Sequence, residues 1–252
     1  MKVKTLLLLL LLGFTPAAYA REETVTISGR VTDFDGNPID SSIVRLLHAD
    51  FQDAYVTYTD HNGYYTLPDV KKGRYAALYV LRPEEYPRQN AVPKEDMRLE
   101  FWAWNVIADR NLILDARYHR LELYGTTVFE QIGGYPMLFV YFRPMSLTRY
   151  ISYEELFLDK ARMEANDTDI SALPEYLDVE VYADGEPLEI YSVQPVEEYV
   201  GETGRQLGYL AQVARPSRCP DKPYVVFRVV ATNREHGEKG ENIYFYELKN
   251  YE

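Results

Sequence analysis

Most of this chain alternates apolar with polar residues in short runs, and glycine-containing dipeptides separate these runs. Clear examples of the alternation lie at residues 24–31, 55–60, 224–230 and 242–249. β-branched and aromatic residues at a period of two predict strands. The separating dipeptides, each with a glycine suited to a tight turn, are Asp35-Gly36, Asn62-Gly63, Lys72-Gly73 and Asp184-Gly185. The pattern predicts an all-β fold of antiparallel sandwiches rather than βαβ units.

One stretch departs from this period. Ser152 is followed three residues later by Glu155, which is the spacing of a helix capping box. Apolar residues then recur at helical spacing as far as Ala161, and Asn166 is a plausible end. We predict one helix, at residues 153–165, inserted between strands of the second half.

The first residues have the pattern of an export signal. Lys2 and Lys4 precede an unbroken leucine run at 6–12, and the stretch ends in a small-x-small pattern at Ala20. The apolar run is shorter than the roughly 20 residues that span a bilayer, so we expect no retained transmembrane anchor. A lipoprotein needs a cysteine at the cleavage point, and the only cysteine is Cys219. We therefore expect cleavage after Ala20 and an exported product, periplasmic or extracellular.

The net charge limits which partners the chain can bind, and the cysteine content shows that no internal disulfide stabilises it. The net charge is −12, and removal of Lys2 and Lys4 with the leader takes it to −14. An acidic chain repels phosphate backbones, so nucleic acid and anionic membranes are poor partners. A single cysteine cannot form an internal disulfide, so the fold must depend on hydrophobic cores. We interpret Cys219 as an incidental loop thiol.

The segment RVTDFDGNPID raises the question of a calcium loop. Oxygen-bearing side chains alternate at Asp33, Asp35 and Asn37, but the glycine comes too early and Val44 stands where the closing glutamate belongs. The same Thr-Asp-x-Asp/Asn-Gly pattern recurs at residues 59–63. Two copies favour structural turns in which the aspartates bond the local backbone. We predict no metal and no cofactor, and a weak site near Asp33 and Asp35 is the open alternative.

These turn motifs carry a resemblance to a known family. From residue 24 to about 120 the chain resembles the carboxypeptidase regulatory-like domain. The positions that match its ordered motifs are Gly29, Val31, Asp33, Gly36, Pro38, Ile39, Thr59, Asp60, Gly63, Tyr65, Leu67, Gly73 and Tyr75. The resemblance implies a transthyretin-like, seven-stranded sandwich. It also implies a non-catalytic folding, spacing or docking module, of the kind attached to peptidases, to outer-membrane receptors and to exported Bacteroidetes proteins.

The domain organisation follows from the extent of this resemblance. We predict a transthyretin-like sandwich at residues 24–122 and a second sandwich, with the inserted helix, at residues 123–252. The second half resembles no family known to us.

An aromatic cluster is the strongest candidate for a binding site. Alternation places Phe101 and Ala103 on one face of a strand and Trp102 and Trp104 on the other. The tryptophan face either packs against the second half or forms an exposed platform that binds sugar rings or a partner protein. The candidate ligand-binding residues are Trp102, Trp104, Tyr86, Tyr135, Tyr150 and Tyr153.

Catalytic motifs are missing from the sequence. The four histidines lack metal-ligand spacing, and no nucleophile elbow or phosphate-binding glycine loop occurs. We therefore expect a non-catalytic binding or scaffolding protein of a bacterial envelope, with an envelope protein or a polysaccharide as its ligand. The alternative is a small extracellular hydrolase of glycosidase type, or its accessory subunit, which would show two carboxylates about 5 to 10 Å apart in a cleft. A third class, structural assembly, would show open sheet edges.

Overall fold

The computed structural model describes residues 23–89, 91–131, 137–157, 161, 168–200, 204–216 and 222–247. Strands dominate this part of the chain, and α1 (Leu147–Phe157) is its one α-helix, so the predicted all-β fold is confirmed. The predicted leader and Cys219 lie outside the described residues. Short 3-10 turns are η1 (Pro83–Glu85), η2 (Pro87–Gln89), η3 (Lys94–Asp96) and η4 (Pro174–Tyr176).

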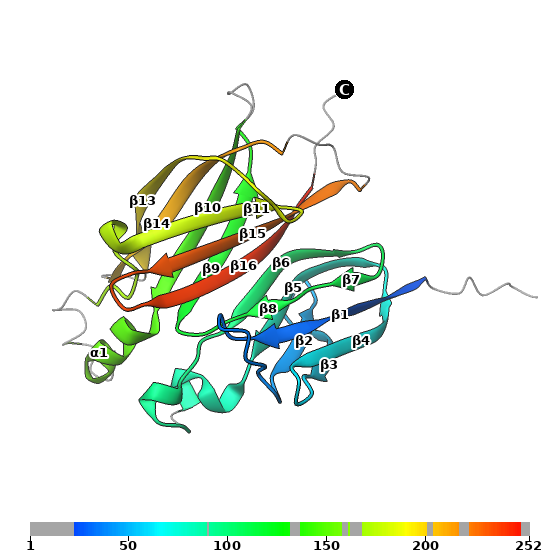
Figure 1. Ribbon diagram of the computed structural model, residues 1–252, viewed down its shortest axis with the longest axis horizontal. Helices are drawn as coiled ribbons and strands as arrows, with labels where there is room; N and C mark the ends of the chain where they lie inside the picture. Colours follow the sequence, from blue (N-terminus) through cyan, green and yellow to red (C-terminus); the bar gives the residue numbers. More distant parts are fainter. Residues whose placement is uncertain are drawn as a thin grey trace, which may run out of the picture.

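An eight-stranded sheet runs through the whole molecule (Figure 1). Its strands, in spatial order, are β12 (Glu186–Pro187), β11 (Leu177–Ala183), β15 (Tyr224–Asn233), β16 (Glu238–Glu247), β6 (Phe101–Ala108), β5 (Gly73–Leu81), β2 (Ile43–Leu47) and β3 (Asp53–Tyr58). Neighbouring strands pair antiparallel except β16 and β6, which are parallel. This single parallel contact joins strands from the two halves of the sequence.

Two four-stranded sheets pack against the large one. The first consists of β4 (Tyr64–Lys71), β1 (Thr24–Thr32), β7 (Leu112–Ile113) and β8 (Ala116–Arg117), with β7 and β8 both paired to β1. The second has the order β13 (Ile190–Val200), β14 (Gly204–Ala214), β10 (Met137–Ser146) and β9 (Leu121–Phe129). Each small sheet makes a sandwich with one half of the large sheet.

The two small sheets cover opposite faces of the large sheet. In the parallel contact, Ala103 lies beside Ile243 and Trp104 lies beside Tyr244. Ala103 and Ile243 belong to the hydrophobic core beneath the first small sheet, whereas Tyr244 packs on the core beneath the second. Adjacent residues of a strand point to opposite faces, so the sheet carries one core on each side. Each core therefore ends where its small sheet ends, and beyond that line the large sheet continues without a covering sheet. We call each of these two lines a step.

The first core draws on both halves of the sequence. Most of its members lie between Val25 and Tyr118, but Tyr224, Ile243 and Phe245 also belong to it. The division at residue 122 stays a prediction, because the eight-stranded sheet and this core both cross it.

The two aspartate turns have the predicted structural role. Asp33 Oδ1 accepts backbone hydrogen bonds from Asp35 and Asn37 at 2.9 Å each. Asp60 Oδ1 accepts them from Asn62 and Tyr64 at the same distance. These bonds fix tight turns, which is the interpretation that the repeated motif favoured.

The helix begins earlier than the capping-box pattern predicts. Strand β10 runs directly into α1 at Leu147, and Ser146 Oγ accepts a hydrogen bond from the Arg149 amide at 3.2 Å. Ser152 lies inside the helix and donates to the Arg149 carbonyl at 2.6 Å. The predicted start at residue 153 is wrong, because Ser146 and not Ser152 caps the helix; residues 158–160 and 162–165 lie outside the described part.

Candidate functional site

Strand β6 separates its apolar residues between two faces. Phe101 and Ala103 are fully buried in the first core, on the side of β1. Trp102 and Trp104 point to the opposite face, which lies beyond the cover of the first small sheet. They belong to a separate small cluster built on β2, β5 and β6, with Leu47 and Ala77 as its aliphatic base.

Four aromatic rings form what we call the aromatic ledge: Tyr79, Trp102, Trp104 and Tyr124. The indoles of Trp102 and Trp104 are stacked, with centroids 4.6 Å apart and planes at 6°. Tyr79 packs on Trp102 at 4.3 Å. Tyr124, from β9 of the second small sheet, sets its ring edge-on to both indoles at 6.1 and 5.9 Å. The ledge is therefore built by both sandwiches at one step of the large sheet.

The two indoles differ in their access to solvent. Trp102 is 9% exposed, and its Nε1 donates to Glu100 Oε1 at 2.9 Å. Trp104 is partly exposed, and its Nε1 has no hydrogen-bond partner in the described chain. Phe51, which is 55% exposed, extends the aromatic surface beside Trp104 at 6.4 Å. The Nε1 atom of Trp104 is itself buried, and because buried polar atoms are nearly always hydrogen-bonded, this unpartnered N–H is an exception.

Two buried carboxyl groups lie beneath the ledge. Glu100 precedes β6 and accepts from Trp102 Nε1 and, at 2.6 Å, from the Tyr79 hydroxyl. Glu122, from β9, is 3% exposed and shares a hydrogen bond with Glu100. Burial, followed by the charge and hydrogen bond of Glu100, raises the pKa of Glu122 well above its ordinary value, and Arg88 opposes this shift. The raised pKa favours the protonated form of Glu122, in which its carboxyl group can donate to Glu100.

The carboxyl pair does not have the geometry of a glycosidase. The two acids of such an enzyme stand about 5 to 10 Å apart with the sugar between them. Glu100 and Glu122 are in hydrogen-bond contact, both are buried, and the Glu100 oxygens already serve Trp102 and Tyr79. The arrangement orients the aromatic rings of the ledge.

Three further predicted site residues, Tyr86, Tyr150 and Tyr153, are not among the rings of the ledge. Tyr86 and Tyr150 are partly buried against a small core of Met97, Leu99 and Leu147. The Tyr86 phenol lies near both acids. Burial, followed by the charges of Glu122 and Glu100, raises its pKa. Tyr153 lies three residues after Tyr150 on α1 and is also partly buried. Tyr135 lies outside the described residues.

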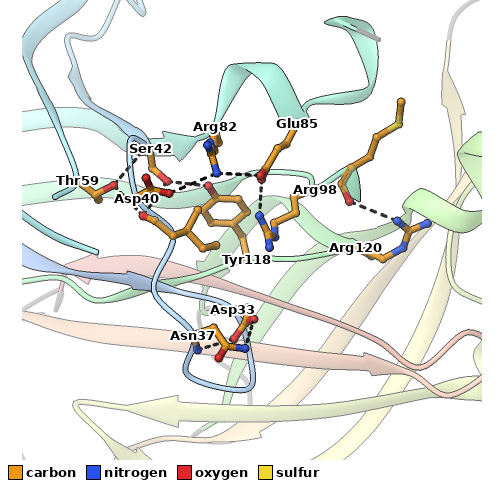
Figure 2. Close-up of polar contacts among 12 residues, drawn as sticks. Asp33, Asn37, Asp40, Ser42, Thr59, Arg82, Glu85, Arg98, Tyr118 and Arg120 are labelled. Atoms are coloured by element: carbon orange, nitrogen blue, oxygen red, sulfur yellow. Dashed lines mark hydrogen bonds and ion pairs between the residues drawn. The ribbon is translucent and has the colours of Figure 1, made fainter. Parts of the chain in front are cut away.

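The segment that carries Tyr86 is anchored by ion pairs to the first sandwich (Figure 2). Figure 2 shows Glu85 between Arg82 and Arg98, at 3.1 and 2.6 Å, with Asp40 also 3.4 Å from Arg82. The Glu85 side chain is largely buried, so this carboxylate fixes the position of η1. Tyr86 is thereby held beside the ledge by its neighbour in sequence.

Other site chemistry is limited in the described chain. Within those ranges, no group of three or more His, Cys, Asp or Glu side chains is placed to hold a metal ion. Of the helices described, none is long and apolar enough to cross a membrane.

Sequence reasoning missed Glu100, Glu122, Tyr79 and Tyr124 as parts of the site. Glu100 could have been identified from the sequence, because the alternation that pairs Trp102 with Trp104 also places Glu100 on their face. The others come from strands whose neighbours in space no local pattern reveals.

The comparison with protein families confirms the resemblance of the N-terminal part. Residues 26–83 match the carboxypeptidase regulatory-like domain, and no curated protein matches the chain. The matched region ends before β6, so it contains Tyr79 of the ledge but not Trp102, Trp104, Tyr124 or the second half of the chain.

Solved structures give only distant matches. A candidate carbohydrate-binding protein from Bacteroides uniformis is 10% identical with a TM-score of 0.29, over 89% of this chain and 99% of that one. BcpA, the major pilin subunit of Bacillus cereus, is 11% identical with a TM-score of 0.27, over 89% and 69%. The major pilin SpaD of Corynebacterium diphtheriae is 8% identical with a TM-score of 0.26, over 88% and 64%. With such low TM-scores, what this chain does has to be inferred from its own site.

Proposed function

We propose that this chain is a non-catalytic, exported binding or scaffolding protein of a bacterial envelope. Its ligand, a glycan or a protein partner, docks on the aromatic ledge. The observation that carries the proposal is Trp104: its ring is partly exposed, is stacked on Trp102 and is held in place by its neighbours. Export rests on the predicted leader at residues 1–20.

The ledge offers a prearranged surface. Stacking on Trp102 and the edge contacts of Tyr124 fix the Trp104 ring before a ligand arrives, so little side-chain entropy is lost on binding. Phe51, between β2 and β3, and Val56 and Tyr58 of β3 are exposed. They continue the apolar surface away from the step. A ring with one apolar face and hydroxyl groups at its rim matches such an aromatic surface.

A hydrolase is the less favoured function. Catalysis on a glycan requires carboxyl groups that reach the substrate, and Glu100 and Glu122 are buried and bonded to each other and to the ledge. Both side chains are better explained as supports of the aromatic rings.

The test is tryptophan fluorescence of the mature chain with iodide quenching, followed by titration with host and bacterial polysaccharides and with envelope extracts. We expect partial quenching, arising from Trp104, and an emission change on ligand binding. Trp104→Ala should abolish the change, while Trp102→Phe should retain it if folding is intact. An emission that responds to no polysaccharide and no envelope protein would contradict the proposal.

A further inference from the structure

A cleft lies at the second step of the large sheet, and none of the ledge residues lines it. It has a volume of about 540 Å³, within the usual range of roughly 300 to 1,000 Å³ for small-molecule sites. Its walls are residues 110–114 around β7, the turn at 184–185, and the side chains of β15 that point toward the first core's face. Both predicted domains therefore contribute to it, on the opposite side of the sheet from the ledge.

The charge of this cleft is opposite to that of the chain. The whole sequence has 39 acidic and 27 basic residues. The cleft is lined by three basic side chains, Arg110, Lys222 and Arg228, and by a single acidic one, Asp184. An isolated basic surface on an acidic protein attracts anions locally without attracting polyanions from a distance.

The basic groups are held in position by fixed acids. Lys222 Nζ lies 2.6 Å from Asp184 Oδ1 and 4.9 Å from the Tyr224 ring centre. The Asp184 carboxylate is itself oriented by the Val226 amide at 3.0 Å. Ion pairing and the aromatic face thus restrain Lys222 at the wall of the cleft.

Arg228 shares its acid with a second arginine. Glu241, whose side chain is completely buried, lies 2.6 Å from Arg228 Nη1 and 2.6 Å from Arg117 Nη2. Arg110 is paired with Asp109 at 2.9 Å and is half exposed. Each of the three basic side chains that line the cleft is thus paired with an acid, and two of these acids, Asp109 and Glu241, lie outside the lining.

The rest of the wall is apolar. Ile113 is 79% exposed at the edge strand β7, and Leu112 and Val226 also line the cleft. Guanidinium groups recognise planar carboxylates, and aliphatic side chains accept the C–H face of a ring. Guanidinium donors whose charges are already paired suit a ligand with isolated carboxylates and not a run of phosphates.

We propose that this cleft binds an acidic oligosaccharide. A uronic-acid carboxylate is held by Arg110 and Arg228, and the apolar face of the sugar ring lies against Ile113 and Val226. The site is independent of the aromatic ledge, because the two lie on opposite faces of the eight-stranded sheet.

The test is calorimetric titration of the full mature chain with trigalacturonate and with its fully methyl-esterified form. We expect the acid to bind at least about tenfold more tightly than the neutral ester, and Arg110→Gln to weaken the acid by about tenfold. Arg205→Gln is the matched control, because it removes the same charge from an exposed, ion-paired arginine on β14. Thermal unfolding of both variants verifies folding.

The outcomes separate this proposal from the ledge. Trp104→Ala should leave trigalacturonate binding unchanged, and Arg110→Gln should leave ligand binding at the ledge unchanged. Equal affinity for acid and ester, equal loss in Arg110→Gln and Arg205→Gln, or no binding of the acid at millimolar concentration would each overturn the cleft assignment.

Discussion

The two steps of the large sheet differ in the strand that borders each of them. At the aromatic ledge the border is β9, which has nine residues and sets Tyr124 and Glu122 over β6. At the basic cleft the border is β7, which has two residues and covers much less of the sheet. The longer border strand covers more of its step, and the shorter one leaves its step open as a cleft.

Each step also contains a buried glutamate, and the two are used in opposite ways. Glu122 at the ledge lies beside another carboxyl group, and burial raises its pKa. Glu241 at the cleft makes ion pairs with two arginines. The same residue type is thus favoured in its protonated form at one step and is ion-paired at the other.

The largest expected effect is loss of the ring that anchors the ledge. Trp102→Ala should lower the free energy of unfolding by about 3 to 5 kcal/mol, because Trp102 is buried between Tyr79, Trp104 and Tyr124. Chemical denaturation measures the change. Trp104→Ala is the paired control and should cost less, since Trp104 is partly exposed; equal costs would break the distinction between a structural and a ligand-binding indole.

A somewhat smaller effect is expected at the cleft. Glu241→Gln should cost about 2 to 3 kcal/mol, because it leaves Arg117 and Arg228 without their shared carboxylate, while their partial exposure lets water solvate them. Glu122→Gln, measured at neutral pH by the same denaturation, should cost little. If Glu122→Gln proves the more damaging of the two, the contrast between the glutamates is wrong.

The ledge glutamate should also respond to pH. Because its pKa is raised in the folded state, the stability that protonated Glu122 contributes is present below its ordinary value of 4.5 and is lost as pH rises through the folded-state pKa. Relative to Glu122→Gln, the wild type should lose stability between these limits, with a Tm change of about 2–4 °C for each kcal/mol. Melting curves of both proteins, recorded across this pH range, measure the difference in Tm. If the Tm of the two proteins changes with pH in parallel, Glu122 does not have a raised pKa in the folded state.

The smallest expected effect lies outside both steps. Ser146→Ala removes the cap of α1 and should cost about 1 kcal/mol. Ser152→Ala, inside the helix, should cost less, in contrast to the capping-box prediction. Both variants should bind ligands normally at the ledge and the cleft, which calorimetry can verify.

Much of the fold was predictable because its signals are local. The strands, the aspartate turns and the opposite faces of β6 follow from alternation and from turn residues two to four positions apart. The helix start was mispredicted because a strand that continues directly into a helix leaves no loop to mark the boundary, and Ser146 lacks a glutamate three residues later.

The site was only partly predictable. Trp102 and Trp104 were identified from their shared face, but whether that face is open depends on Tyr124, which reaches it from another sheet. Glu122 has no distinctive sequence context, and its raised pKa arises from burial beside Glu100. Contacts of this kind depend on the arrangement of strands and not on spacing along the chain.

The sequence by itself determined the all-β class, the turns and the N-terminal resemblance, because these depend on the period of side chains and on the conformations that glycine and aspartate permit. Only the tertiary structure decided that β16 pairs with β6, so that one sheet carries a core on each face. Residues 103 and 243 meet through the packing of two hydrophobic faces, a long-range choice that no local pattern encodes. The ledge and the cleft exist because of that single contact.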